Sequence, residues 1–219
     1  MGDHTNQVII LSGGEPLAST DNVALPLGAR VIAADSGLHH AAELDLDVDL
    51  VIGDMDSVDA GRLAAAVDRG VEARTFPSDK DRTDLELAVD VALGWGATDF
   101  TFVGAHTGRL DHFLGAMAMF AALAERVERL VWIDGSTWIT ACPPQRAVSI
   151  AARPGDTVSL IPVGEGVTGV TATGLRWPLH DDAIPAGSTR GISNVCVAPP
   201  VRLSVDRGTI LVVHERTRP

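Results

Sequence analysis

Short apolar runs that alternate with alanine-rich segments dominate residues 8–134, and this alternation restricts the fold of the chain more than any other feature. The apolar runs read VIIL, RVIAA, DLVIG, FTFVG and RLVWI, and the segments between them have helical spacing. Strands that alternate with helices form a parallel sheet with helices on both faces. We therefore expect an α/β domain over residues 1–134.

The pattern changes after Asp134, where short strands punctuated by glycine and proline replace the helical spacing. Such a pattern is typical of small antiparallel β structures. We expect a C-terminal all-β sandwich domain over residues 135–219, with a tight junction near Gly135 that lets the two domains share a site.

The charge balance indicates which partners the chain binds. It has 29 acidic and 17 basic residues, a net charge of −12 and an isoelectric point near 4.8. This charge has the wrong sign for binding a phosphate backbone, so we expect no nucleic-acid partner. Lys80 is the only lysine, so anions are expected to be held mainly by arginines, backbone N–H groups or a metal ion.

Cysteine usage and hydropathy favour a cytoplasmic protein. Cys142 and Cys196 have no metal-ligand or redox spacing, so we expect two buried side chains in a reducing compartment. The N-terminal segment MGDHTNQVIILSGG lacks the features of a secretory signal. The most apolar segment, LGAMAMFAALA, is too short to span a bilayer, so we expect no membrane association.

Polar segments, most of them with an aspartate, follow the predicted strands of residues 8–134. They are SGGEP, DSG with Asp35, GDMDS with Asp54 and Asp56, PSDKDRTD with Asp81 and Asp84, and GAHTGRLDH. In open α/β sheets, ligands gather at the carboxyl ends of the strands. Several acidic turns at one edge indicate a hard cation, and Mg²⁺ fits best because it is commonly held by a few carboxylates and substrate phosphates.

Two of these segments also have a purely structural explanation. In GDMDS, Asp54 or Asp56 would accept hydrogen bonds from backbone N–H groups while Ser57 caps the next helix, and this explains the segment as well as a metal site does. In DKDRTDLE, Thr83 and Glu86 have capping-box spacing, which by itself favours a simple helix start.

Two further segments allow more than one interpretation. In TGRLDH, either Arg109 binds phosphate with Asp111 or His112 at a substrate edge, or these side chains pair with one another in a structural role. The glycines of SGGE indicate a phosphate-binding loop only weakly, because the lysine and Ser/Thr of a P-loop are missing.

Seven motifs in a fixed order give the chain a family resemblance over nearly its whole length. They are AADSG (33–37), IGDMDS (52–57), DKDRTDLELA (79–88), TGRLDH (107–112), SLIPVG (159–164), GVTATGLRWPL (169–179) and SN (193–194). With them the chain resembles the thiamine pyrophosphokinases, which transfer a pyrophosphoryl unit from ATP to the hydroxyethyl oxygen of thiamine and release AMP. The family's architecture, an α/β nucleotide domain followed by a β-sandwich, agrees with the strand and helix pattern.

The resemblance implies a magnesium site made of acidic side chains. Asp54, Asp56 and Asp81 match the magnesium-binding carboxylates of the family, and Asp35 and Asp84 match residues that support that cluster or the substrate. Phosphoryl transfer requires mainly positioning and charge neutralisation, and carboxylate-bound Mg²⁺ with an arginine provides most of this.

Nucleotide contacts are implied at the same strand ends. Arg109 matches a phosphate contact, and Asp111 matches a residue that faces the nucleotide or the substrate hydroxyl. The base that accepts the proton of the alcohol stays open among Asp56, Asp84 and Asp111. The implied nucleotide-binding set is Asp35, Ser36, Gly37, Lys80, Thr83, Gly108, Arg109 and His112.

Thiamine contacts are implied in the β half. Ser193 and Asn194 match residues that hold the vitamin, and Trp177 either forms a wall of that site or packs an edge of the sandwich. Family members are homodimers with the vitamin bound where subunits meet, so the resemblance implies a homodimer that uses ATP and Mg²⁺.

Three positions depart from the family's usual pattern. Ser36 and Thr107 stand where a glycine is common, and Leu87, which we expect in the core, replaces a basic or polar residue. All the acidic positions are present, which supports the catalytic identity more than the fine substrate preference.

Two other classes of function stay open. A different Mg-dependent phosphate-handling enzyme, such as a pterin-type pyrophosphokinase or a phosphohydrolase, would release AMP or phosphate without thiamine. A non-catalytic relative that binds nucleotide or thiamine diphosphate would more naturally have lost Asp54, Asp56 or Arg109.

Overall fold

The computed structural model describes residues 6–13, 25–104 and 109–216 of the chain, which forms two compact units. The first unit contains residues 1–119 and 127–135, and the second contains residues 120–126 and 136–219. None of the helices within the described ranges is long and apolar enough to cross a membrane.

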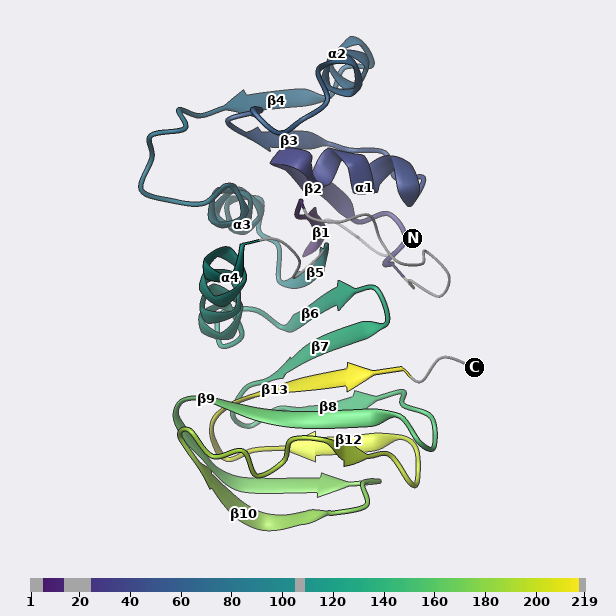
Figure 1. Cartoon of the computed structure of the whole chain (residues 1–219), viewed down its shortest axis with the longest axis vertical. Coiled ribbons are helices and arrows are strands. Elements are labelled where there is room, and N and C mark those ends of the chain that lie inside the picture. Colours follow the sequence, from purple (N-terminus) through teal and green to yellow (C-terminus); the bar gives the residue numbers. More distant parts are fainter. Residues whose placement is uncertain (1–5, 14–24, 105–108, 217–219) are drawn as a thin grey trace. The chain divides into compact units, whose positions relative to one another are not determined.

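A parallel sheet forms the centre of the first unit (Figure 1). Its strands are β1 (Gln7–Leu11), β2 (Arg30–Ala34), β3 (Leu50–Gly53), β4 (Glu72–Thr75), β5 (Asp99–Val103) and β6 (Arg129–Asp134). They lie in the order β4-β3-β2-β1-β5-β6, and each neighbouring pair is parallel. The chain therefore winds outwards from β1 in one direction and then in the other, with the reversal between β1 and β5.

Helices cover the sheet and bury its apolar strands. They are η2 (Asp35–Gly37), α1 (Leu38–Glu43), α2 (Ala60–Asp68), α3 (Asp84–Gly94) and α4 (Leu110–Leu123). Val31 and Val51 pack on the face covered by α1 and α2, whereas Ile10 and Ile32, which alternate with them, point to the opposite face. α3 packs against β1, β2 and β3 and buries Leu87, as expected. The predicted sheet with covering helices is confirmed.

β4 is the strand that the apolar pattern did not predict. Its residues Glu72 and Arg74 form an ion pair of 2.6 Å, and three of its four positions are exposed. β4 lies at one end of the strand order, and edge strands carry charged side chains that discourage pairing with other chains. Without an apolar run, such a strand gives no signal in the sequence.

Side-chain caps set the starts of α2 and α3. Asp59 Oδ1 accepts a hydrogen bond from Arg62 N at 2.8 Å, and Thr83 Oγ1 accepts one from Glu86 N at 3.3 Å. The predicted cap at Thr83 is confirmed. The prediction that Ser57 caps the next helix is wrong, because Asp59 occupies the cap position of α2.

The second unit is built from antiparallel strands. They are β7 (Thr137–Cys142), β8 (Ala147–Ile150), β9 (Thr157–Thr173), β10 (Leu179–Pro185), β11 (Asn194–Val195), β12 (Val201–Ser204) and β13 (Arg207–Glu215). The first half of β9 pairs with β11 and β13, and its second half pairs with β10 and β12. From Ser136 onwards the described residues form no helix, which confirms the predicted all-β character.

Both cysteines are buried in the apolar core of the second unit. Burial raises the pKa of the Cys142 thiol to about 11 and also raises the pKa of Cys196. These side chains therefore behave as small apolar groups, as the sequence indicated.

Candidate active site

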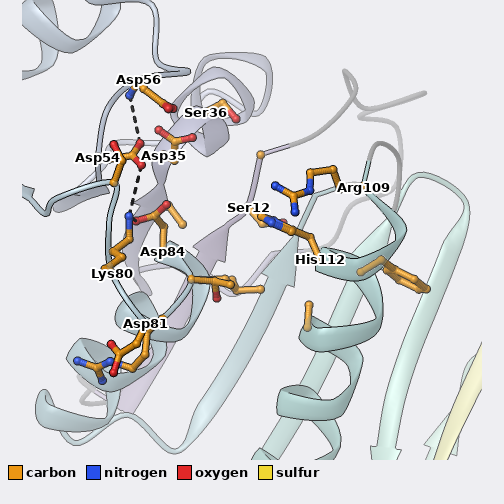
Figure 2. Close-up of a pocket in the computed structure, with 18 of the residues that line it drawn as sticks. Ser12, Asp35, Ser36, Asp54, Asp56, Lys80, Asp81, Asp84, Arg109 and His112 are labelled. Atoms are coloured by element: carbon orange, nitrogen blue, oxygen red, sulfur yellow. Dashed lines mark hydrogen bonds and ion pairs between the residues drawn. The ribbon is translucent and has the colours of Figure 1, made fainter.

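A cavity of about 760 Å³ lies at the carboxyl ends of the parallel strands in the first unit. It is close to the reversal of strand order between β1 and β5, which is where open α/β sheets bind ligands. Figure 2 shows acidic side chains along one wall and, along the opposite wall, Arg109, which directly precedes α4, and His112 of α4. The lining residues are Ser12, Gly13, Ala34, Asp35, Ser36, Asp54, Asp56, Ser78, Lys80, Asp81, Arg82, Thr83, Asp84, Leu85, Arg109, His112, Phe113, Ala116 and Trp132.

Three carboxylates from different elements converge on one wall of this cavity. Asp35 follows β2, Asp54 follows β3 and Asp84 begins α3, and one oxygen of each lies within 4.8 Å of the others. Gly53, with φ +154°, leaves space for them: a Cβ there would lie 3.2 Å from Asp35 Cβ and 3.3 Å from Asp84 Cγ. The glycine of IGDMDS therefore allows the carboxylates to meet.

Asp54 and Asp56 form the turn that the structural explanation of GDMDS predicts. Asp56 N donates a hydrogen bond to Asp54 Oδ1 at 3.3 Å, and Met55 between them has φ +66°. This backbone hydrogen bond lowers the pKa of Asp54, whereas hydrogen bonding to Asp54 and the charge of Asp54 raise the pKa of Asp56. Asp54 is therefore the more firmly ionised of the two carboxylates.

Asp35 has one carboxylate oxygen that is available to bind a cation. Its Oδ2 accepts a hydrogen bond from Ser57 Oγ, but its Oδ1 is buried and has no hydrogen-bond partner among the described residues. A buried carboxylate oxygen without a partner is destabilising. Oxygen donors of this kind fit Mg²⁺, and Asp35, Asp54 and Asp84 would hold it.

Two of these carboxylates, Asp54 and Asp84, contact the Lys80 ammonium group. Lys80 Nζ lies 3.4 Å from Asp54 Oδ2 and 3.2 Å from Asp84 Oδ1. Burial opposes its charge, but the ion pairs outweigh this effect and the pKa of Lys80 is raised. Burial raises the pKa of Asp84, and the ion pair with Lys80 only partly offsets this.

The structure does not bring all three expected magnesium ligands together. Asp54 belongs to the converging group and Asp56 lies in the same turn, but Asp81 lies apart, beyond Lys80 in Figure 2. Asp35 and Asp84, which the resemblance gave a supporting role, complete the converging group.

The turn of η2 fits closely against the end of β1. A Cβ on Gly13 would lie 2.0 Å from Ser36 Oγ, so the missing side chain at Gly13 makes room for the serine that replaces the usual glycine. Ser36 lines the cavity, while Gly37 is buried in η2. Thr83 lines the cavity and also caps α3.

Arg109 and Asp111 pair with each other at the start of α4. Arg109 Nη2 lies 2.6 Å from Asp111 Oδ2, and both side chains are well exposed. This pairing lowers the pKa of Asp111 to about 2. Arg109 and His112 line the cavity and Asp111 does not, so the two interpretations of TGRLDH coexist. Gly108 and Thr107 lie outside the described residues.

The residues expected to contact thiamine lie near one another in the second unit. The buried Asn194 donates from Nδ2 to Trp177 O at 2.8 Å and accepts from Trp177 N at 3.1 Å. The Trp177 side chain is 57% exposed. Ser193, at φ +56°, is exposed, and its N–H donates to Ser159 Oγ at 3.0 Å. Asn194 thus holds Trp177 in place through the backbone.

Several lining residues were not predicted as site residues. Trp132 lies in β6, where its apolar neighbours indicated core; its Nε1 donates to Gly104 O at 2.9 Å and its ring stacks on Phe102. Phe113 and Ala116 lie in α4, whose apolar sequence gives no sign of a site. Ser12 directly follows β1, and the polar segment SGGEP was the one available signal there.

Two family models match the chain in sequence. The "Thiamin pyrophosphokinase, catalytic domain" matches residues 28–131, and the "Thiamin pyrophosphokinase, vitamin B1 binding domain" matches residues 147–210. The thiamine pyrophosphokinase of Bacillus subtilis is 28% identical over 162 residues, which cover 74% of this chain and 76% of that protein. The thiamine pyrophosphokinase 1 of Oryza sativa subsp. japonica is 27% identical over 177 residues, which cover 77% of this chain and 66% of that protein.

Solved structures of such proteins share the fold. The Bacillus subtilis thiamine pyrophosphokinase has a TM-score of 0.84 at 24% identity and covers 97% of this chain and 100% of its own. The thiamin pyrophosphokinase of Geobacillus thermodenitrificans has a TM-score of 0.78 at 27% identity, with 96% and 98% covered. The family models together span most of the sequence, and their boundaries enclose the acidic motifs. The chain belongs to the thiamin pyrophosphokinase family.

Proposed function

We propose that this protein is a Mg-dependent thiamine pyrophosphokinase that transfers pyrophosphate from ATP to thiamine, giving thiamine diphosphate and AMP. The observation that supports this most strongly is the cavity in which Asp35, Asp54 and Asp84 face Arg109. Carboxylates suit a metal that carries the triphosphate, and the guanidinium suits phosphate oxygens.

The cavity lining combines charged side chains with apolar and aromatic ones. The charged ones include the carboxylates and Lys80, and the others include Phe113, Ala116 and Trp132. We assign the triphosphate to the charged side chains and the nucleobase to the aromatic ones, since flat rings pack well on aromatic side chains. Ser36, Thr83 and His112 would then contact the nucleotide from the cavity wall.

The transfer forms one bond and breaks another at phosphorus. The hydroxyl oxygen of thiamine bonds to the β-phosphorus of ATP while the bond from that phosphorus to the α-phosphate oxygen breaks, so AMP leaves with that oxygen. Bound Mg²⁺ supplies neutralisation of the negative charge on the transferring group. Arg109 holds phosphate oxygens and neutralises part of the same negative charge.

The hydroxyl proton passes to a carboxylate. Asp111 is the weakest base of the three candidates, because its pairing with Arg109 lowers its pKa to about 2. Asp56, whose pKa is raised, is the stronger base, because Asp84 would be occupied as a ligand of Mg²⁺. We therefore assign the proton acceptor to the acidic wall of the cavity.

The second unit would serve as a β-sandwich thiamine-binding domain. Trp177 offers an exposed aromatic face, Asn194 fixes its backbone, and Ser193, next to Asn194 in the chain, is exposed. Together with the implied homodimer, this supports a thiamine site at the subunit interface. We assign the enzyme to the cytoplasm, where ATP and Mg²⁺ are available.

Product analysis tests the proposed function. The purified protein is incubated with ATP and Mg²⁺, with and without thiamine, and AMP and thiamine diphosphate are quantified. We expect both products in equal amounts, and only with thiamine. AMP or phosphate release without thiamine would support a different phosphate-handling enzyme, and no product in either reaction would support a non-catalytic binding protein.

A further inference from the structure

The one lysine of the chain lies inside the acidic wall of the cavity. Lys80 belongs to the loop between β4 and α3, and its side chain is only 14% exposed. Its Nζ lies 3.4 Å from Asp54 Oδ2 and 3.2 Å from Asp84 Oδ1. These are two of the three carboxylates that converge with Asp35. The ammonium group therefore neutralises part of the charge that a metal ion would neutralise.

A divalent cation and the Lys80 ammonium compete for the same carboxylates. The converging oxygens lie within 4.8 Å of one another, and Mg²⁺ requires its oxygen ligands at about 2.0–2.1 Å in near-ideal geometry. An ammonium group in contact with two of these carboxylates would then lie a few ångströms from a doubly charged ion. At such distances the repulsion near a protein surface is large.

The position of Lys80 on the cavity wall allows its side chain to leave the carboxylates and point into the cavity. Ser78, Asp81, Arg82 and Thr83 of the same loop also line the cavity, so the lysine stem is already on the cavity wall. The side chain is unbranched and flexible, and its ammonium is a compact charge that contacts single phosphate oxygens well. A rotation of the side chain would move the charge from the carboxylates into the cavity.

We propose that Lys80 is a displaceable internal cation, which contacts the Asp54–Asp84 side of the acidic cluster in the metal-free protein and turns onto a nucleotide phosphate when the metal binds. This inference rests on the proposed function insofar as the incoming metal is the one that accompanies ATP. Lys80 weakens metal binding without nucleotide and strengthens it with nucleotide. Lys80 therefore makes the binding of the metal and the nucleotide cooperative.

Because Lys80 is the only lysine, isotope labelling observes it directly. Protein made with [ε-¹³C]lysine gives one side-chain signal in NMR spectra, with no assignment needed. We expect Mg²⁺ alone at high concentration to shift this signal towards the position of a free lysine. Mg²⁺ with a non-hydrolysable ATP analogue should shift it to a third position, which a phosphate contact produces.

Metal affinity without nucleotide gives a second measurement. In Lys80→Met, calorimetry should show Mg²⁺ binding about tenfold tighter than in the wild type, because a unit charge a few ångströms from the metal is removed. Affinity for the Mg–ATP analogue should fall. The control is Arg74→Met, which removes a positive charge from the neighbouring strand β4, where Arg74 pairs with Glu72 at 2.6 Å and does not line the cavity. We expect it to leave Mg²⁺ affinity within about twofold of the wild type.

Two results would overturn the inference. One is Mg²⁺ affinity in Lys80→Met that is unchanged or weaker, and the other is a wild-type lysine signal that does not move when Mg²⁺ and the analogue bind. Neither measurement involves thiamine or turnover, so the inference fails or stands separately from the proposed reaction. The NMR measurement uses the wild-type chain and does not depend on how Lys80→Met folds.

Discussion

At the scale of single residues, Asp54 and Asp56 have different environments in the structure, although the sequence gives no reason to distinguish them. Asp54 accepts a backbone hydrogen bond from Asp56 and contacts Lys80, and its pKa is lowered. Asp56 is exposed and faces the charge of Asp54, and its pKa is raised. Ionised Asp54 therefore stabilises the fold and ionised Asp56 destabilises it.

The first prediction is that Asp56→Asn raises the melting temperature at neutral pH, whereas Asp54→Asn lowers it or leaves it unchanged. Each should reduce kcat by about 100-fold or more, the range seen when a group that stabilises transition-state charge is removed. Thermal melts without metal and steady-state rates provide the measurement. A normal rate in either variant would show that its Asp is only a turn residue.

The shifted pKa values predict how the stability effects of these substitutions change with pH. The pKa of Asp56 is higher in the folded protein than its ordinary value of 3.8. Below pH 3.8 Asp56 is protonated in both states and does not affect stability, and it destabilises the fold as pH rises through the folded pKa. The advantage of Asp56→Asn should therefore disappear below about pH 4. Asp54 contributes stability above 3.8 and loses it as pH falls through its lowered folded pKa. An advantage of Asp56→Asn that persists at pH 3 would rule out the electrostatic cause.

At the scale of elements, a buried polar pair connects β13 to the segment that leads into β9. His214 Nε2 lies 2.8 Å from Asp156 Oδ2, and both side chains are less than 5% exposed. Asp156 Oδ2 also accepts a hydrogen bond from Arg153 N at 2.8 Å. These contacts fix the turn before the longest strand of the second unit, on which β10, β11, β12 and β13 all pair.

The second prediction is that His214→Leu lowers the free energy of unfolding by about 3 kcal/mol, since removing one member of a buried charged or hydrogen-bonded pair leaves the other poorly solvated. Urea denaturation followed by circular dichroism measures this loss. The control is Arg190→Leu, which breaks the exposed 2.6 Å ion pair with Asp182. We expect that variant to lose less than about 1 kcal/mol, and equal losses in the two variants would contradict the role of burial.

At the scale of the whole molecule, α4 carries an apolar surface that the described residues leave exposed. No charged residue occurs between His112 and Glu125, yet Leu110 and Leu114 are 68% and 58% exposed. A helix that is apolar on all sides is normally buried. This surface suits the second copy of the chain that the proposed homodimer requires.

The third prediction is that the protein sediments as a dimer and that Leu110→Glu with Leu114→Glu weakens self-association by at least about 100-fold, given roughly 1.5–3 kcal/mol for each buried leucine. Analytical ultracentrifugation over a range of concentrations measures this. The control is Val67→Glu on α2, where Val67 is 48% exposed and we expect no change. A dimer of unchanged strength in the leucine variant would place the interface elsewhere.

The sequence determined the features that depend on short-range patterns. Apolar runs with helical segments between them predict the parallel sheet, because side-chain burial on both faces needs continuous apolar strands. Thr83 and Glu86 predict the start of α3, because a cap is a local interaction. The motifs around Asp54 and Arg109 were recognisable because each is a short contiguous stretch of sequence.

Only the tertiary structure decided which of these residues meet. Asp35, Asp54 and Asp84 follow different strands and loops, and their convergence depends on strand order and on the missing side chain of Gly53. The polar strand β4 and the contact between Lys80 and Asp54 have no local signal. Distances between segments far apart in sequence are set by packing, and packing is a property of the folded chain as a whole.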